Sequence, residues 1–189
     1  MDKTLTPDKK FIKVLGLLDN YLSSLNYEYC LVGGLAVQVR GRPRFTHDID
    51  LCILTSLSDQ EALISNFSQE FELRFEGADD LARSSQILPL LVEGIEVDIS
   101  LGLSLFEEGV VKTASLEQIT PDLCLPVCSA EDLIVFKIIA GRPKDIEDIK
   151  SIIAYSSDAL DREKITKNLR LFETALAEDG LLERFKELT

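Results

Sequence analysis

Two aspartates one residue apart in an apolar run constrain this chain more than any other feature. They lie in HDIDLCIL, residues 47–54, which alternates between polar and apolar positions as a β-strand does. Alternate side chains of a strand share a face, so Ile49 and Leu51 point into a core while Asp48 and Asp50 point together the other way. Two carboxylates on one face repel each other unless a cation lies between them. The motif therefore indicates either a solvent-exposed strand face or a divalent-cation site.

A second strand offers a third carboxylate by the same argument. The segments ILPLLV and IEVDISL flank Glu93-Gly94, which is a hairpin signal. Asp98 lies on the polar face of the second segment. If this strand lies beside the first, Asp98 joins Asp48 and Asp50. Three carboxylates hold two metal ions about 3.5–4 Å apart in enzymes that transfer phosphoryl groups.

A glycine pair precedes the acidic motif. Gly33 and Gly34 follow the strand-like YEYCLV and precede a short helix that we expect to end near Gly41. Backbone N–H groups at such a strand-to-helix turn cradle phosphates in many proteins, although Gly-Gly alone is often only a tight turn. Its position ahead of the two aspartates favours phosphate binding.

The composition limits the class of protein. The chain has 189 residues, 46% of them hydrophobic, which is enough for one good-sized domain. Its apolar runs are too short for a transmembrane helix, and its polar N-terminus indicates no signal peptide. The net charge of −13 argues against non-specific nucleic-acid binding but not against a small basic site for one phosphate-rich ligand. The four cysteines lack zinc-site spacing, so we expect reduced thiols and a cytoplasmic location.

The remaining pattern predicts an α+β fold. Helices are expected after Thr6-Pro7 and over residues 58–67, and strands at FELRFE, LEQI and LCLPV. Towards the C-terminus the chain turns helical. We therefore expect a sheet-containing core over residues 1–128, and a C-terminal helical region over residues 129–189 that packs on it.

The chain resembles the DNA polymerase β-like nucleotidyltransferase superfamily over about residues 30–150. The shared motif is an apolar residue, two glycines, a spacer and Asp-apolar-Asp-apolar, seen here as Val32-Gly33-Gly34, thirteen residues, and Asp48-Ile49-Asp50-Leu51. Val97-Asp98-Ile99 matches the third carboxylate, and Arg44-x-Thr46 looks like the lead-in of small bacterial members. Lys137 and Arg142 have the K-x-x-x-x-R spacing of AbiEii-type abortive-infection toxins.

The resemblance implies a mixed sheet flanked by helices, and a Mg²⁺- or Mn²⁺-dependent transfer of NMP from an NTP to an acceptor hydroxyl. It implies three catalytic, metal-binding carboxylates: Asp48, Asp50 and Asp98. It also implies six nucleotide-binding residues: Gly33, Gly34, Arg44, Thr46, Lys137 and Arg142. The acceptor would be a tRNA or other RNA end, a protein hydroxyl or a small molecule, and a toxin would have an antitoxin partner. A non-catalytic protein of the same fold that binds a nucleotide or a partner is the alternative.

The charged residues of the helical half each have two interpretations. Lys137 is the only charge in LIVFKIIA, so it either snorkels to solvent or meets an anion, and we favour the anion. Arg142 and Lys144 either contact phosphate or lie in a solvated turn between helices. Asp145 either orients Arg142 or complements a helix dipole, and we favour the second.

The residues between the two motifs are also ambiguous. Arg40, Arg42 and Arg44 form a basic spot that either receives phosphates or pairs with surface acids. We expect surface pairing for Arg40 and a functional role for Arg44. His47 alternates away from the carboxylates, so we assign it no catalytic role.

Overall fold

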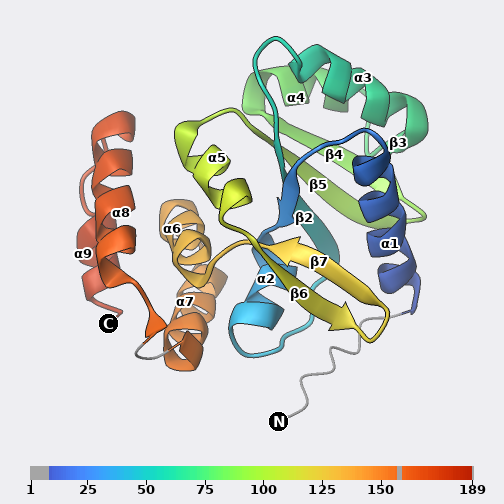
Figure 1. Ribbon diagram of the computed structural model, residues 1–189. Coiled ribbons are helices and arrows are strands. Elements are labelled where there is room, and N and C mark those ends of the chain that lie inside the picture. The colour runs from blue at the N-terminus through green and yellow to red at the C-terminus, as the bar shows by residue number, and fades with distance from the viewer. Residues whose placement is uncertain (1–8, 157–158, 189) are drawn as a thin grey trace.

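The computed structural model describes residues 9–156 and 159–188. Thr6 and Pro7, which were predicted to start the first helix, lie outside the described residues. Helices and strands alternate along the described chain as Figure 1 shows, with these bounds: α1 Lys9–Ser24, β1 Tyr29–Leu31, α2 Gly33–Arg40, β2 Asp48–Leu54, α3 Gln60–Glu70, β3 Glu72–Leu73, α4 Ala78–Ser85, β4 Ile87–Val92, β5 Ile95–Gly102, α5 Leu105–Lys112, β6 Ser115–Thr120, β7 Leu123–Val127, α6 Ala130–Ala140, α7 Pro143–Ser156, α8 Arg162–Leu176 and α9 Leu181–Lys186.

The described strands form one mixed sheet in the order β3-β4-β5-β2-β1-β7-β6. The pairs β2–β5 and β1–β7 are parallel, and the other neighbours are antiparallel. The predicted α+β class with a mixed sheet flanked by helices is confirmed. Strand β2, which carries the acidic motif, lies in the middle of the sheet with a neighbour on each side.

The hairpin between β4 and β5 forms as predicted. Its turn residues Glu93 and Gly94 have φ angles of 52° and 75°. Two consecutive positive φ angles are typical of the type I′ turn, whose twist matches that of paired strands. The turn brings Val92 opposite Ile95 and sets the register of β5 against β4.

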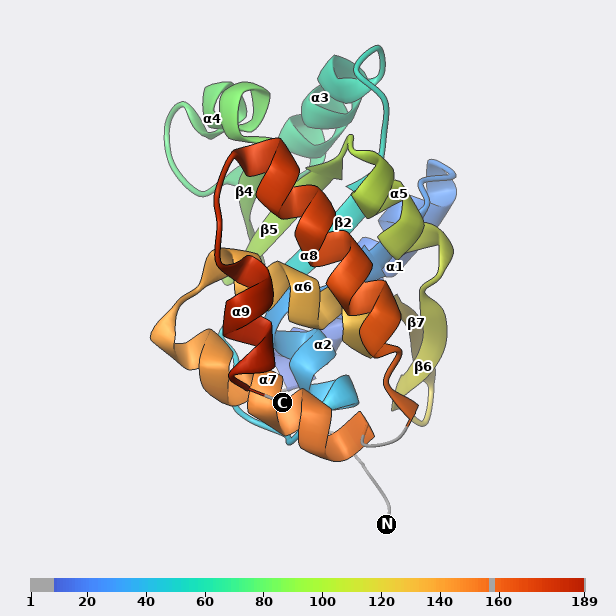
Figure 2. The ribbon, with the colours of Figure 1, turned by 90° about the vertical axis from the view of Figure 1, so that its left-hand side faces the viewer.

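Helices cover both sides of the sheet. Figures 1 and 2 show α1 on one side and the helices α6 to α9 on the other. On the α1 side, Tyr21 packs edge-on against Phe67 and Phe71 of the α3 region, with ring centroids 5.2 and 5.0 Å apart. A single cluster of buried apolar side chains joins the sheet to α1 and to the C-terminal helices.

Two helices and one strand differ from the prediction. The strand expected at FELRFE is only Glu72–Leu73, because the chain then leaves the sheet edge for α4, which was not predicted. Helix α4 follows Gly77, which has φ 83° and provides no side-chain cap, so the acidic Asp79 and Asp80 in its first turn were the available signal for its start. Helix α5 was also missed, although Ser104 and Glu107 form a full capping box at its start.

Two predictions from composition can be compared with the described residues. All four cysteines are free thiols, and only Cys124 is exposed. No helix among the described residues is long and apolar enough to cross a membrane.

Candidate active site

The three predicted carboxylates lie on neighbouring strands. Strands β2 and β5 run parallel with Asp48 opposite Glu96 and Asp50 opposite Asp98. Because residues two apart on a strand share a face, all four carboxylates lie on the same face of the sheet. The condition set by the sequence, that the strand with Asp98 lies beside the strand with Asp48 and Asp50, is met.

The turn before α2 brings the backbone onto Asp50. Gly33 has φ 59°, and a Cβ at this position would overlap the Asp50 carboxylate. The N–H of Gly34 donates to Asp50 Oδ2 at 3.2 Å. Only glycine combines that backbone conformation with so close an approach, so the pair of glycines places the start of α2 against the acidic motif.

Thr46 holds the second carboxylate. Its hydroxyl donates to Asp48 Oδ1, and the residue is 9% exposed. A Cβ on Gly34 would overlap the Thr46 hydroxyl, so Gly34 leaves the space that Thr46 fills. Thr46 therefore orients Asp48 in the structure; its predicted contact with a nucleotide stays a prediction.

The pKa values of the two aspartates of β2 shift in opposite directions. Burial raises the pKa of Asp50, the nearby Asp48 charge raises it further, and the Gly34 N–H opposes both without cancelling them. Burial also favours a higher pKa for Asp48, but the Thr46 hydrogen bond and the charges of Lys144 and Arg44 outweigh it, so the pKa of Asp48 is lowered. Asp50 therefore carries a charge that its surroundings compensate poorly.

Asp98 is engaged by an arginine that the sequence analysis did not single out. Arg74 Nη2 donates to Asp98 Oδ1 at 2.7 Å. Burial raises the pKa of Asp98, and the Arg74 charge lowers it without cancelling that effect. The available sequence signal was one basic residue in the acidic segment FELRFE, which gave no indication of a partner 24 positions away.

The donor set of Asp48 and Asp50 fits a hard divalent cation, because both residues offer carboxylate oxygens and Asp50 carries a poorly compensated negative charge. In residues 9–156 and 159–188, no group of three His, Cys, Asp or Glu side chains is placed to hold a metal ion. Asp98, the predicted third ligand, instead makes its ion pair with Arg74. The structure therefore places Asp48 and Asp50 side by side on one strand and pairs Asp98 with Arg74, and the metal site itself stays a prediction.

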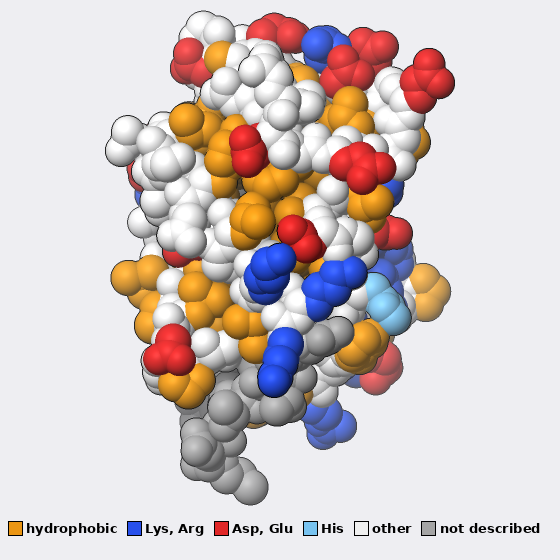
Figure 3. Space-filling model, turned by 90° about the vertical axis from the view of Figure 1, so that its right-hand side faces the viewer, with side chains coloured by type: hydrophobic (Ala, Val, Ile, Leu, Met, Phe, Trp, Pro, Cys, Tyr) orange, Lys and Arg blue, Asp and Glu red, His pale blue; other side chains and the backbone are white. Residues whose placement is uncertain are grey.

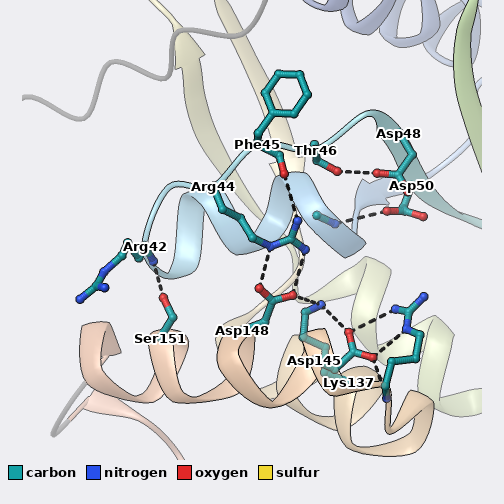
Figure 4. A network of polar contacts seen from close by, with 12 residues as sticks. Arg42, Arg44, Phe45, Thr46, Asp48, Asp50, Lys137, Asp145, Asp148 and Ser151 are labelled. Carbon is teal, nitrogen blue, oxygen red and sulfur yellow. Dashed lines mark hydrogen bonds and ion pairs between the residues drawn. The ribbon is translucent and has the colours of Figure 1, made fainter.

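Lys137 contacts two carboxylates of the protein itself, so its predicted contact with a nucleotide phosphate stays a prediction. Its Nζ lies 3.1 Å from Asp145 Oδ1 and 2.7 Å from Asp148 Oδ2, and the lysine is 4% exposed. Arg44 binds the same Asp148 with Nε at 2.7 Å and Nη2 at 2.9 Å. Figure 4 shows this ion network beneath Asp48 and Asp50, linking the loop before β2 to α6 and α7.

Asp145 orients Arg142, which is the interpretation that we did not favour. Arg142 Nε donates to Asp145 Oδ2 at 2.7 Å, and the Arg142 backbone N–H donates to the same oxygen at 3.1 Å. Asp145 lies in the first turn of α7, so it also complements that helix dipole, but its side chain is fully buried between Arg142 and Lys137. The preference for the dipole alone was wrong, because it ignored Lys137 on the preceding helix.

The other residues between the motifs behave differently from one another. Arg40 pairs with Glu117 at 2.6 Å and donates to the Cys128 carbonyl, so the expected surface pairing is confirmed. His47 is exposed and stacks edge-on against Phe45 at 4.5 Å. Figure 3 shows Lys and Arg side chains gathered beside the single histidine, so the acidic excess of the chain is not spread evenly.

Comparison with models of known protein families shows which family this chain belongs to. A family model described as nucleotidyltransferase of unknown function (DUF6036) matches residues 9–177. The chain belongs to this family. Its membership supports the polymerase β-like superfamily that the motifs indicated, but it does not confirm the AbiEii-type branch. No curated protein matches the chain.

Solved structures share the fold of this family member. The antibiotic-resistance factor ANT(2'')-Ia is 15% identical with a TM-score of 0.63, over 90% of this chain and 95% of that one. The lincosamide antibiotic adenylyltransferase LnuA is 18% identical with a TM-score of 0.51, over 79% of this chain and 98% of that one. An antigenic nucleotidyltransferase-like protein from Paracoccidioides brasiliensis is 18% identical with a TM-score of 0.51, over 94% of each chain. At these identities the likeness concerns the fold alone.

Proposed function

We propose that this protein is a divalent-metal-dependent nucleotidyltransferase that moves NMP from an NTP to a hydroxyl of a small molecule. The observation that carries the proposal is the contact between the glycine turn and the acidic motif, in which the start of α2 lies against Asp50. This contact sets a helix N-terminus, which favours phosphate, beside carboxylates, which favour a hard cation. Membership of the nucleotidyltransferase family supports the reaction class.

In this proposal the three carboxylates act together. Asp48, Asp50 and Asp98 would hold the divalent cations, and Asp98 would also accept the proton of the acceptor hydroxyl. The hydroxyl oxygen forms a bond to the α-phosphorus as the bond from that phosphorus to the bridging oxygen of pyrophosphate breaks. When bound, Mg²⁺ or Mn²⁺ supplies neutralisation of the triphosphate charge. The protein contributes mainly positioning, with Thr46 fixing Asp48 and the glycine turn fixing Asp50.

The basic residues would bind the triphosphate at two depths. Arg142 and Arg44 have side chains that are 56% and 34% exposed, so both can reach a phosphate without leaving their aspartates. Lys137 is too deeply buried for direct contact in this conformation, so we assign it the support of Asp145 and Asp148 from beneath. Lys144 is exposed, and its charge acts on Asp48, so it joins the same rim.

The overall charge and the structural neighbours support a small-molecule acceptor. A net charge of −13 opposes the approach of RNA, whose binding depends on neutralising phosphates. ANT(2'')-Ia has been seen with adenylyl-2''-tobramycin, and LnuA with lincomycin. A toxin activity and an antitoxin partner stay predictions from the resemblance, with no observation that adds to them.

The test incubates the protein with Mg²⁺ or Mn²⁺ and each α-labelled NTP, offering a set of aminoglycosides and lincosamides, total RNA or total cell protein as acceptor. We expect label in the small-molecule fraction and release of pyrophosphate, both lost in Asp50→Asn. Asp80→Asn is the matched control, because Asp80 is an 84% exposed aspartate on α4. Full transfer by Asp50→Asn would overturn the assignment, and label in RNA or protein would replace the acceptor.

A non-catalytic, nucleotide-binding protein is the second candidate. It is favoured by the pairing of the basic residues with internal carboxylates, since Lys137, Arg44 and Arg142 are all engaged by Asp145 or Asp148. Binding of an NTP with metal but no pyrophosphate release with any acceptor would establish this candidate over the enzyme.

A further inference from the structure

Four carboxylates share one small area of the sheet. Asp48 lies opposite Glu96, and Asp50 lies opposite Asp98, on two adjacent parallel strands. Like charges on neighbouring strands destabilise a sheet unless a cation compensates them. In the absence of metal, this area therefore needs a positive group supplied by the protein itself.

Arg74 supplies that positive group. The backbone N–H of Arg74 donates to the backbone carbonyl of Pro89 at 3.1 Å. Pro89 on β4 lies opposite Asp98 on β5. The side chain thus reaches across β4, where its Nη2 lies 2.7 Å from Asp98 and its Nη1 lies 3.6 Å from Glu96. The guanidinium binds the acidic area from the side opposite to the glycine turn.

Within the part of the chain that the structure describes, the guanidinium of Arg74 does not have a hydrogen-bond partner for each of its buried nitrogens. Its Nε is buried, and it has no hydrogen-bond partner among the described residues. An unpaired buried donor costs free energy, so the contact with Asp98 is made at a cost that another arrangement would relieve. Asp98 is bound to Arg74 at one oxygen, and no three-carboxylate group is assembled with Asp48 and Asp50.

We propose that Arg74 competes with a divalent cation for Asp98, so that the third carboxylate is withheld until metal and nucleotide draw it towards Asp48 and Asp50. This inference rests on the proposed function, because it concerns the same site. Arg74 is a positioning residue here, since it acts on the cation through Asp98. Without a bound cation, the Arg74 charge balances the acidic area, and it opposes binding of a second positive charge there.

The test measures Mn²⁺ affinity, without nucleotide or acceptor, from the loss of the free-Mn²⁺ electron paramagnetic resonance signal. We expect Arg74→Gln to bind Mn²⁺ roughly tenfold more tightly than the unaltered protein, because a competing unit charge next to the site is removed. The gain should vanish when Asp98→Asn is added, since Asp98 would no longer be available. Arg83→Gln is the matched control. Arg83 pairs with Glu61 on α3 and Asp79 on α4, so this substitution removes one arginine charge away from the acidic area.

The outcomes separate this inference from the proposed function. Equal Mn²⁺ affinity in the unaltered protein and Arg74→Gln would overturn the inference. If Mn²⁺ binding by both is nevertheless lost when Asp50→Asn is added, the proposed function still stands. No Asp50-dependent Mn²⁺ binding in any variant would overturn both. If Arg74→Gln does not fold, Arg74→Lys carries the test: a single ammonium holds Asp98 less firmly than a guanidinium, so a gain of roughly threefold is expected, and no gain would overturn the inference.

Discussion

At the scale of single residues, Gly33 is the most constrained position in the site. Its φ is 59°, and a Cβ there would overlap the Asp50 carboxylate. We expect Gly33→Ala to lower the free energy of unfolding by about 1–3 kcal/mol and the transfer rate by roughly 100-fold, because strain and displacement of Asp50 act together. Urea denaturation and pyrophosphate release measure the two effects.

Gly16 provides the control for that substitution. It lies within α1, and a Cβ there would meet no atom within 4 Å. Gly16→Ala should therefore stabilise the protein by about 0.5–1 kcal/mol, through helix propensity, and leave transfer unchanged. A Gly33→Ala protein as active as Gly16→Ala would show that the turn is not a determinant of the site.

Thr46 tests whether the orientation of Asp48 matters. Valine has the shape of threonine without the hydroxyl that donates to Asp48 Oδ1, whereas serine keeps the hydroxyl. We expect Thr46→Val to lower the transfer rate by roughly tenfold or more, and Thr46→Ser to retain most of it, since one positioned hydrogen bond is involved. The rates come from pyrophosphate release at saturating nucleotide. Equal losses in both variants would indicate packing instead of hydrogen bonding.

At the scale of elements, Asp148 links three separate segments. From α7 it binds Lys137 of α6 and Arg44 of the loop between α2 and β2. Asp148→Asn should lower the free energy of unfolding by about 3 kcal/mol at neutral pH, because the buried Lys137 charge loses one of its two carboxylates. Urea denaturation measures the loss. A change under about 0.5 kcal/mol would show that the network contributes little to stability.

The stability difference between the unaltered protein and Asp148→Asn should also depend on pH. Burial by itself raises the pKa of Asp148, but hydrogen bonds from Arg44 and Lys137 outweigh it and leave the pKa below its usual value. A carboxyl with a lowered folded-state pKa stabilises the protein above its unfolded pKa, about 3.9, and loses that effect as the pH falls through the folded pKa. The stability difference between the unaltered protein and Asp148→Asn should be constant from pH 7 to about 5 and shrink below about pH 4. Urea titrations at each pH measure it, and a difference that grows on acidification would contradict the argument.

Local signals explain which elements the sequence predicted. Alternation identified β2 and β5, and Glu93-Gly94 identified the hairpin, because both signals lie within a few residues. Helix α4 gave no capping signal, although it contributes Ala82 to the buried apolar cluster. The pairing of Arg74 with Asp98, like that of Lys137 with Asp148, depends on how distant segments pack. Spacing along the chain identified the carboxylates of the candidate site, but it did not show which arginine or lysine pairs with which carboxylate.

At the scale of the whole molecule, the sheet and the C-terminal helices share their core. The single apolar cluster contains Ile49 and Val97 of the sheet together with Ile134 of α6, Ile152 of α7 and Leu169 of α8. The division into a core over 1–128 and a helical region over 129–189 stays a prediction about the sequence. The shared cluster indicates that the two parts depend on each other for burial of their apolar faces.

A shared core predicts how the chain unfolds. The complete protein should unfold in urea in one transition, with fluorescence and circular dichroism coinciding, as a single cooperative unit does. A chain truncated after residue 128 should give no cooperative transition, because the sheet face against α6 would expose the apolar surface that Leu133, Ile134 and Ile138 cover. A truncated chain that unfolds cooperatively and still binds Mn²⁺ would show instead that the sheet is an independent domain. The ion network around Lys137 would then serve only to hold the helical region in place, since every residue it recruits from α6 and α7 would be dispensable for the carboxylate site.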